Sequence, residues 1–78
     1  MNSEEIKKLE RVVRIGRAEL VIPKIANEIR SRLTTAEAEP LGNIEEFLAR
    51  SFNDDPTKDI EKYIEYIVML ARKKAFRR

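Results

Sequence analysis

Hydrophobic residues recur at three- and four-residue steps near the start of the chain, which is the spacing of one face of an α-helix. Over residues 3–16 this spacing places four apolar side chains on one side: Ile6, Leu9, Val12 and Val13. Asn2, with Glu5 three residues later, matches the capping-box pattern of a helix start. Gly16 is suited to end this helix, because glycine readily adopts the left-handed conformation that follows a helix C-cap.

A second helix is predicted over residues 17–38, and Pro23 complicates its start. The apolar positions of this segment keep the helical spacing: Ile22, Ile25, Ile29, Leu33 and Ala36. Proline is tolerated in the first turn, where amides lack intrahelical partners, so the helix can begin near residues 18–19. Two alternatives remain open: a first helix that continues without a break and kinks at the proline, or a short β-hairpin around Gly16.

The third predicted helix covers residues 43–52, after a loop at residues 34–43 that contains the breakers Pro40 and Gly42. Asn43 is its expected N-cap. Its apolar stripe is Ile44, Phe47, Leu48 and Phe52.

The last and longest predicted helix covers residues 56–76. Asp55 at the N-cap, with Pro56 in the first helical position, is a strong start signal. Its broad apolar face consists of Ile60, Tyr63, Ile64, Ile67, Val68, Leu70 and Ala71. Acidic residues come first and basic residues last, which matches the dipole of a helix.

These segments predict one all-α domain over residues 1–78, a small antiparallel bundle of three to four helices with a basic C-terminal tail at residues 72–78. A core of this size is marginally stable. The chain has no Cys and no His, so neither a disulfide nor an ordinary zinc site can reinforce it. We therefore expect regular helix packing and association with a partner, either a second copy or a larger protein.

The residue usage is thermophile-like. Ile, Glu, Arg and Lys are abundant, while Cys and Gln are absent. The longest apolar run, residues 67–71, is far shorter than a membrane span, and the N-terminus lacks the pattern of a signal peptide. We therefore expect a cytoplasmic protein that has no contact with a membrane.

Charge is sorted along the chain. Residues 1–36 hold eight Lys/Arg against five Asp/Glu, a net charge of +3. Residues 37–65 hold three against nine, a net of −6, and residues 66–78 hold five against none, a net of +5. These segments sum to the +2 of the whole chain. Such blocks of one sign are typical of a small protein that meets other macromolecules.

The chain supplies few groups for catalysis. No His is present to activate a Ser or Thr nucleophile. Three pairs of acids have ordinary explanations as helix caps or a solvated helix face: Glu45 with Glu46, Asp54 with Asp55, and Glu61 with Glu65. A magnesium site from the aspartates of residues 54–59 lacks the spacing of a calcium-binding loop. We therefore expect no enzymatic activity, no cofactor and no metal.

The first helix carries one candidate contact surface for nucleic acid or a partner. Lys7, Arg11 and Arg14 form a stripe opposite the apolar side, and Lys8 and Arg17 flank it. A row of cations can meet phosphates and release their counterions. The alternative is an ordinary solvated helix face.

The C-terminal segment is the second candidate. Its five cations in seven residues exceed what the helix dipole needs: Arg72, Lys73, Lys74, Arg77 and Arg78. Phe76 among them can stack on a base or enter a pocket of a partner, or it can fold back onto the core. The acidic middle of the chain either caps helices or docks on a basic protein surface.

In size, helical pattern and the ending Arg72-Lys73-Lys74-Ala75-Phe76-Arg77-Arg78, the chain resembles the small basic helical accessory subunits of the crenarchaeal B-family replicative DNA polymerase. The resemblance implies an archaeal, non-catalytic subunit that steadies or stimulates DNA synthesis. We expect an accessory subunit of a nucleic-acid-processing assembly, with a larger protein as partner. The alternative is a stand-alone, sequence-nonspecific DNA- or RNA-binding protein that acts as a homodimer.

Overall fold

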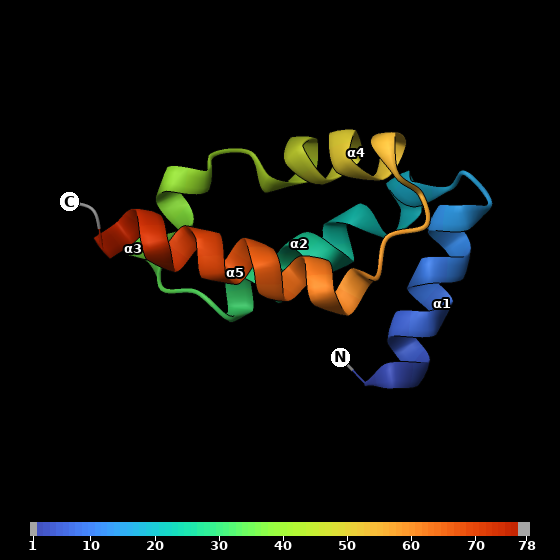
Figure 1. Ribbon diagram of the computed structural model, residues 1–78, viewed down its shortest axis with the longest axis horizontal. Helices are drawn as coiled ribbons and strands as arrows, with labels where there is room; N and C mark the ends of the chain where they lie inside the picture. The colour runs from blue at the N-terminus through green and yellow to red at the C-terminus, as the bar shows by residue number, and fades with distance from the viewer. Residues whose placement is uncertain (1, 77–78) are drawn as a thin grey trace.

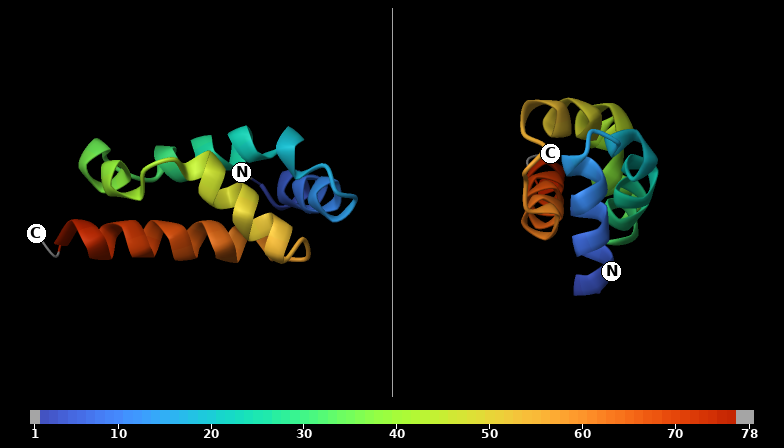
Figure 2. Two further views of the ribbon diagram at one scale, coloured as in Figure 1. Left: turned by 90° about the horizontal axis from the view of Figure 1, so that it is seen from above. Right: turned by 90° about the vertical axis from the view of Figure 1, so that its right-hand side faces the viewer.

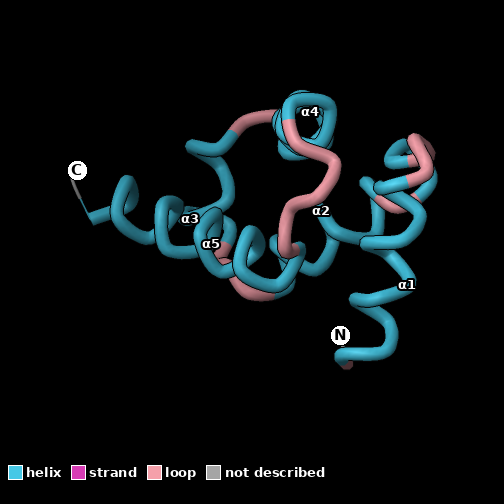
Figure 3. The backbone as a smooth tube through the Cα atoms, turned by 45° about the vertical axis from the view of Figure 1, so that its right-hand side comes forward, coloured by secondary structure: helices cyan, strands magenta, loops and turns pink. Residues whose placement is uncertain are grey.

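The computed structural model describes residues 2–76, with side chains described up to residue 74, and this part of the chain is helical apart from its connections (Figure 1, Figure 3). Its five α-helices are α1 (Ser3–Arg14), α2 (Ile22–Ser31), α3 (Thr35–Ala38), α4 (Ile44–Asp54) and α5 (Ile60–Phe76). Two 3₁₀ turns, Ala18–Leu20 and Glu39–Leu41, lie before α2 and after α3. The described residues contain no strand, so the all-α prediction is confirmed and the hairpin alternative is wrong.

The helices form an elongated body that measures 40 × 24 × 16 Å along its principal axes. α2 packs against both α4 and α5, and α4 runs in the opposite direction to these two helices (Figure 1). α1 lies at one end of the body and contacts α5. The last turns of α5 lie at the other end, so the two basic segments of the sequence are separated by the long dimension of the molecule (Figure 2).

The core is formed by the inner faces of α1, α2, α4 and α5, and all buried side chains among the described residues are apolar. Six large side chains are almost completely enclosed: Ile25, Ile29, Leu48, Ile60, Ile64 and Ile67. They come from the apolar stripes that the sequence predicted. Phe47 departs from its predicted stripe, because 45 % of its surface stays exposed on α4. Leu70 is only half-buried on α5.

The predicted helix over residues 17–38 is confirmed at residues 22–31 but is wrong as one continuous helix, because the segment is broken at two points. Gly16, with a φ of +82°, ends α1 in the left-handed conformation. The amides of Gly16 and Arg17 donate to the carbonyls of Val13 and Val12, which is the hydrogen-bond pair of a Schellman cap. A 3₁₀ turn follows, and α2 then begins with Pro23 in its first turn, where a missing amide costs nothing. The kinked continuous helix is therefore wrong as well.

The predicted loop at residues 34–43 is wrong over most of its length. The Thr34 hydroxyl accepts a hydrogen bond from the Glu37 amide, and the Glu37 carboxylate accepts one from the Thr34 amide at 2.8 Å. This capping box starts α3, and the 3₁₀ turn Glu39–Leu41 follows it. Gly42, with a φ of +68°, separates the turn from α4. The spacing Thr34-x-x-Glu37 was the signal in the sequence for this short helix.

The last helix begins four residues later than predicted, because Asp59 caps it in place of Asp55. The Asp59 carboxylate accepts from the Lys62 amide at 3.1 Å. Asp55 instead accepts from the amide and the hydroxyl of Thr57, an Asx turn that holds the connection from α4. α4 extends to Asp54, two residues beyond its predicted end. Asn43 caps α4 as predicted, through the Glu46 amide.

Candidate interaction surfaces

Several cations of α2, α4 and α5 are paired with carboxylates. Four ion pairs tie helices together or span one helical turn: Lys24 with Glu5 at 2.7 Å, Arg30 with Glu45 at 2.9 Å, Arg50 with Glu46 at 2.9 Å, and Arg72 with Glu37 at 3.8 Å. Arg72 also donates to the Arg32 carbonyl at 3.3 Å. These cations therefore belong to the fold, and Arg72 is less available to a partner than the sequence suggested.

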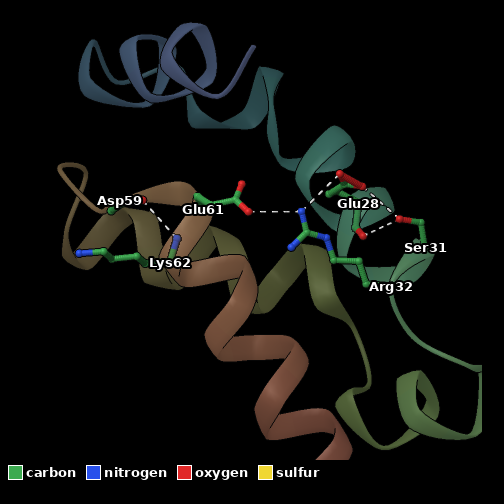
Figure 4. A network of polar contacts seen from close by, with 6 residues as sticks. All are labelled: Glu28, Ser31, Arg32, Asp59, Glu61 and Lys62. Atoms are coloured by element: carbon green, nitrogen blue, oxygen red, sulfur yellow. Dashed lines mark hydrogen bonds and ion pairs between the residues drawn. The ribbon is translucent and has the colours of Figure 1, made fainter. Parts of the chain in front are cut away.

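Arg32 joins α2 to α5 between two carboxylates (Figure 4). Its Nη2 lies 3.5 Å from Oε1 of Glu61 on α5 and 3.7 Å from Oε1 of Glu28 on its own helix. Ser31 donates its hydroxyl hydrogen to Glu28 at 3.0 Å. Glu61 is half-buried here, so its expected place on a solvated face is wrong. The pair of Glu61 with Glu65 is thereby split, because Glu65 is exposed.

The acidic middle of the chain mostly caps and connects helices. The backbone hydrogen bond from Thr34 lowers the pKa of Glu37, and Arg30 lowers the pKa of Glu45. The Thr57 hydroxyl, as a hydrogen-bond donor, lowers the pKa of Asp55. Asp59 caps α5. These uses favour the capping interpretation of this segment over a patch that docks on a basic surface.

The basic face of α1 is different, because no described residue pairs with its cations. We define the α1 basic face by the exposed side chains Lys7, Lys8, Arg11 and Arg14 of the helix, together with Arg17, which follows the Gly16 cap and lies outside α1. The described part of the chain offers none of the five an ion-pair partner. Ile15, which is 71 % exposed at the end of α1, is the large apolar side chain beside them. This face is the predicted stripe, and it stays open to solvent.

The candidate contact residues of the C-terminal segment differ in whether the fold already engages them. Arg72 is paired with Glu37, while Lys73 and Lys74 are exposed and have no ion-pair partner among the described residues. Residues 72–76 continue α5. The side chain of Phe76, and Arg77 and Arg78 as a whole, lie outside the described residues, so their predicted roles remain predictions.

The outward side of α5 is a surface that sequence reasoning missed. Seven residues of this helix fall within a sector of about 140° when 100° is allowed per residue. They are Lys62, Tyr63, Tyr66, Met69, Leu70, Lys73 and Lys74. Both acids of α5, Glu61 and Glu65, lie outside this sector. Tyr66 is 50 % exposed and Met69 is 58 % exposed.

We define the α5 outer face by the exposed or half-buried residues Lys62, Tyr66, Met69, Leu70, Lys73 and Lys74. Tyr63, at its edge, is engaged within the fold: its hydroxyl bonds to that of Ser51, and Lys58 lies 5.2 Å from its ring centre. The positions 62, 66, 69 and 73 follow one another at four- and three-residue steps, which was the available signal in the sequence.

An apolar hollow adjoins the α5 outer face where α5 meets α4. It has a volume of about 80 Å³ and is lined by Leu41, Ile44, Phe47, Ile67, Leu70 and Lys74. The exposed ring of Phe47 therefore belongs to the wall of a depression, beside half-buried Leu70. This hollow explains the position of Phe47 better than the core role that the sequence predicted.

The described residues contain no group of three or more metal-ligating His, Cys, Asp or Glu side chains. Within this same part of the chain, no helix combines the length and the apolar character that crossing a membrane requires. The chain matches no protein-family model, no curated protein and no solved structure.

Proposed function

We propose that this protein is a non-catalytic accessory subunit of a nucleic-acid-processing assembly, and that its α1 basic face contacts the phosphate backbone. The resemblance of its size, helices and basic end to polymerase subunits makes a replicative DNA polymerase the first partner to test. In this function the chain steadies or stimulates synthesis by adding cationic contacts beside a larger enzyme. The α1 basic face serves nucleic acid, and the remaining surface serves the enzyme.

The observation that carries the proposal is the contrast between paired and unpaired cations. Lys24, Arg30 and Arg50 have carboxylate partners within 2.9 Å, whereas the five cations of the α1 basic face have none among the described residues. Unpaired surface cations release counterions when they meet phosphates. The contact is expected to be independent of base sequence, because contacts between cations and phosphates carry no sequence information.

The test compares DNA synthesis and DNA binding with one matched pair of variants. Primer extension by the B-family DNA polymerase of the same cell is measured without the protein, with wild type, and with Lys7→Gln/Arg11→Gln/Arg14→Gln. We expect wild type to lengthen the products and the triple variant to lose this effect. The salt dependence of DNA binding by the complex should flatten by about 0.9 in log–log slope for each phosphate that the variant no longer neutralises.

The matched control removes three charges from paired cations, through Lys24→Gln/Arg30→Gln/Arg50→Gln. This control variant should stimulate DNA synthesis in proportion to the fraction of it that is folded, since the substituted side chains pair with carboxylates within the protein. Equal losses in both variants would mean that net charge alone matters. Mobility shifts of the isolated protein complete the test: we expect weak binding, with a Kd in the range of about 10⁻⁴–10⁻⁶ M. Tight, steeply salt-dependent binding without the polymerase would instead favour a stand-alone nucleic-acid-binding protein.

A further inference from the structure

We propose that the α5 outer face, together with the apolar hollow, is the docking site for an acidic amphipathic helix of the partner protein. This inference rests on the proposed function and specifies the chemistry of the partner that the accessory subunit recognises. The partner helix would place one bulky aliphatic side chain in the hollow and carboxylates beside Lys62, Lys73 and Lys74.

The shape of the surface supports a helical ligand with an apolar anchor. The hollow of about 80 Å³ lies between α4 and α5, and mainly aliphatic side chains line it. Along α5, Tyr66 and Met69 expose 50 % and 58 % of their surface, and Met69 lines a separate depression with Glu65 and Arg72. An exposed apolar strip next to a groove between two helices is the arrangement that binds amphipathic helices.

The charge of the surface determines the charge that its ligand should carry. The outward sector of α5 holds three lysines and no acid. None of these lysines has an ion-pair partner among the described residues. On α4, Glu46 lies one residue before Phe47, but Arg50 holds it at 2.9 Å. A ligand with carboxylates flanking its apolar stripe therefore complements the site, and a basic ligand is repelled.

A second copy of this chain fits the surface poorly. In an antiparallel pairing of two α5 helices, Lys62 of one copy faces Lys73 of the other, because the two positions lie at opposite ends of the strip. In a parallel pairing, each lysine faces its own equivalent. Like charges meet in both arrangements, which disfavours a homodimer through this face.

Single-stranded nucleic acid also fits less well than an acidic helix. Binding of bases depends on aromatic faces on which successive bases stack. Here four of the six residues that line the hollow are Leu or Ile, and only Phe47 is aromatic. Such a hollow accepts an aliphatic side chain more readily than a base plane.

The test uses two designed probe peptides of about 18 residues, labelled with a fluorophore. Both carry leucines at i, i+3, i+4 and i+7 spacing. One has glutamate at the flanking positions, and the other has lysine at the same positions. Fluorescence anisotropy with the full 78-residue chain should give an affinity for the acidic peptide at least about tenfold higher than for the basic one. Amide shifts in NMR spectra should cluster at Phe47, Tyr66, Leu70 and Lys74.

Two protein variants locate the binding to this face. Lys62→Glu/Lys73→Glu should weaken binding of the acidic peptide about tenfold or more and strengthen binding of the basic one. Phe47→Ser should weaken both peptides, because it removes the wall of the hollow. The control Lys7→Glu/Arg11→Glu changes the charge by the same amount on α1 and should leave peptide binding within about twofold once salt screens long-range effects. Circular dichroism verifies that each variant is folded.

Several results would overturn the inference. Equal affinity for the two peptides would mean that the face binds apolar ligands without regard to their charge. A dimer detected by sedimentation that dissociates in the Lys62→Glu/Lys73→Glu variant would mean that a second copy covers the face. Binding of a single-stranded oligonucleotide that these variants abolish, with no peptide binding, would assign the face to nucleic acid. If stimulation of synthesis is lost in the α1 variant but survives Lys62→Glu/Lys73→Glu, the docking site alone is refuted. If stimulation survives in the α1 variant, the proposed function is refuted.

Discussion

The outward faces of α1 and α5 both carry cations without ion-pair partners in the described chain, but they differ in what surrounds the charges. The α1 basic face has five cations with Ile15 at its end, whereas the α5 outer face places Tyr66, Met69 and Leu70 among its lysines. Cations alone suit an extended anion such as a phosphate backbone. Cations around apolar side chains suit a protein surface that has both acidic and apolar groups. One basic chain can therefore hold two different contact surfaces at different places on its body.

The difference between the inner and outer faces of α5 can be tested most strongly by truncating one side chain on each. Ile64→Ala should lower the free energy of unfolding by about 2–5 kcal/mol, because Ile64 is completely buried. Tyr66→Ala, two residues further on, should lower it by less than about 1 kcal/mol, since that ring is half exposed. Urea unfolding followed by circular dichroism measures both values. Equal decreases would show that the α5 outer face is covered in solution.

The end of α1 and the turn that follows it depend on the cap at Gly16. Gly16→Ala should lower the free energy of unfolding by about 1–2 kcal/mol, because alanine resists a φ of +82° although no atom lies within 4 Å of the added methyl group. Arg17→Ala, at the next residue, is the control and should change stability by less than about 0.5 kcal/mol. Thermal unfolding measures this pair. A Gly16→Ala variant that is as stable as the wild type would contradict the left-handed conformation of residue 16 at the end of α1.

The paired charges of the centre predict a smaller effect that depends on pH. Hydrogen bonds from Arg30, the Thr34 backbone and Thr57 lower the pKa values of Glu45, Glu37 and Asp55 in the folded protein. Their stabilisation is therefore complete above the unfolded pKa values and is lost as the pH falls through the lower folded ones. Urea unfolding between pH 7 and pH 2 should show stability falling on the acid side.

One substitution separates the contribution of a single pair. Glu45→Gln should reduce stability at neutral pH by less than about 1 kcal/mol, because the pair with Arg30 is largely solvated, and it should make the acid-side fall shallower. Glu65→Gln, at an exposed carboxylate, is the matched control and should change stability at neutral pH by less than about 0.5 kcal/mol. Stability that increases as the pH falls would contradict the assigned hydrogen bonds.

Much of the local structure could be predicted from the sequence, because its signals act over three or four residues. The apolar stripes of α1, α2, α4 and α5 supplied the core, and the Asn2 and Asn43 caps are in place. The errors fell where two local signals competed. Asp55 and Asp59 both qualify as caps, and the structure uses Asp59, which lies beside the completely buried Ile60. Pro40 and Gly42 indicated a loop, and the capping box at Thr34 was therefore not recognised.

The candidate sites show a sharper division between local and long-range information. The stripe of α1 was visible in the sequence because it lies on one helix. The hollow beside Phe47 was not, since it needs side chains of α4 and α5 that are 20 or more residues apart in the chain. Similarly, only the ion pairs of the folded chain distinguish Lys24 or Arg30 from the cations of α1 that have no partner among the described residues.

The sequence by itself determined that this chain is helical, where the apolar stripe of each main helix lies, and that its end segments are basic. The tertiary structure alone decided which charges neutralise one another, how far apart the basic segments lie, and which apolar side chains remain at the surface. The physical reason is range: helix periodicity and capping act between neighbours in the chain, whereas ion pairing and exposure depend on which distant helix packs alongside.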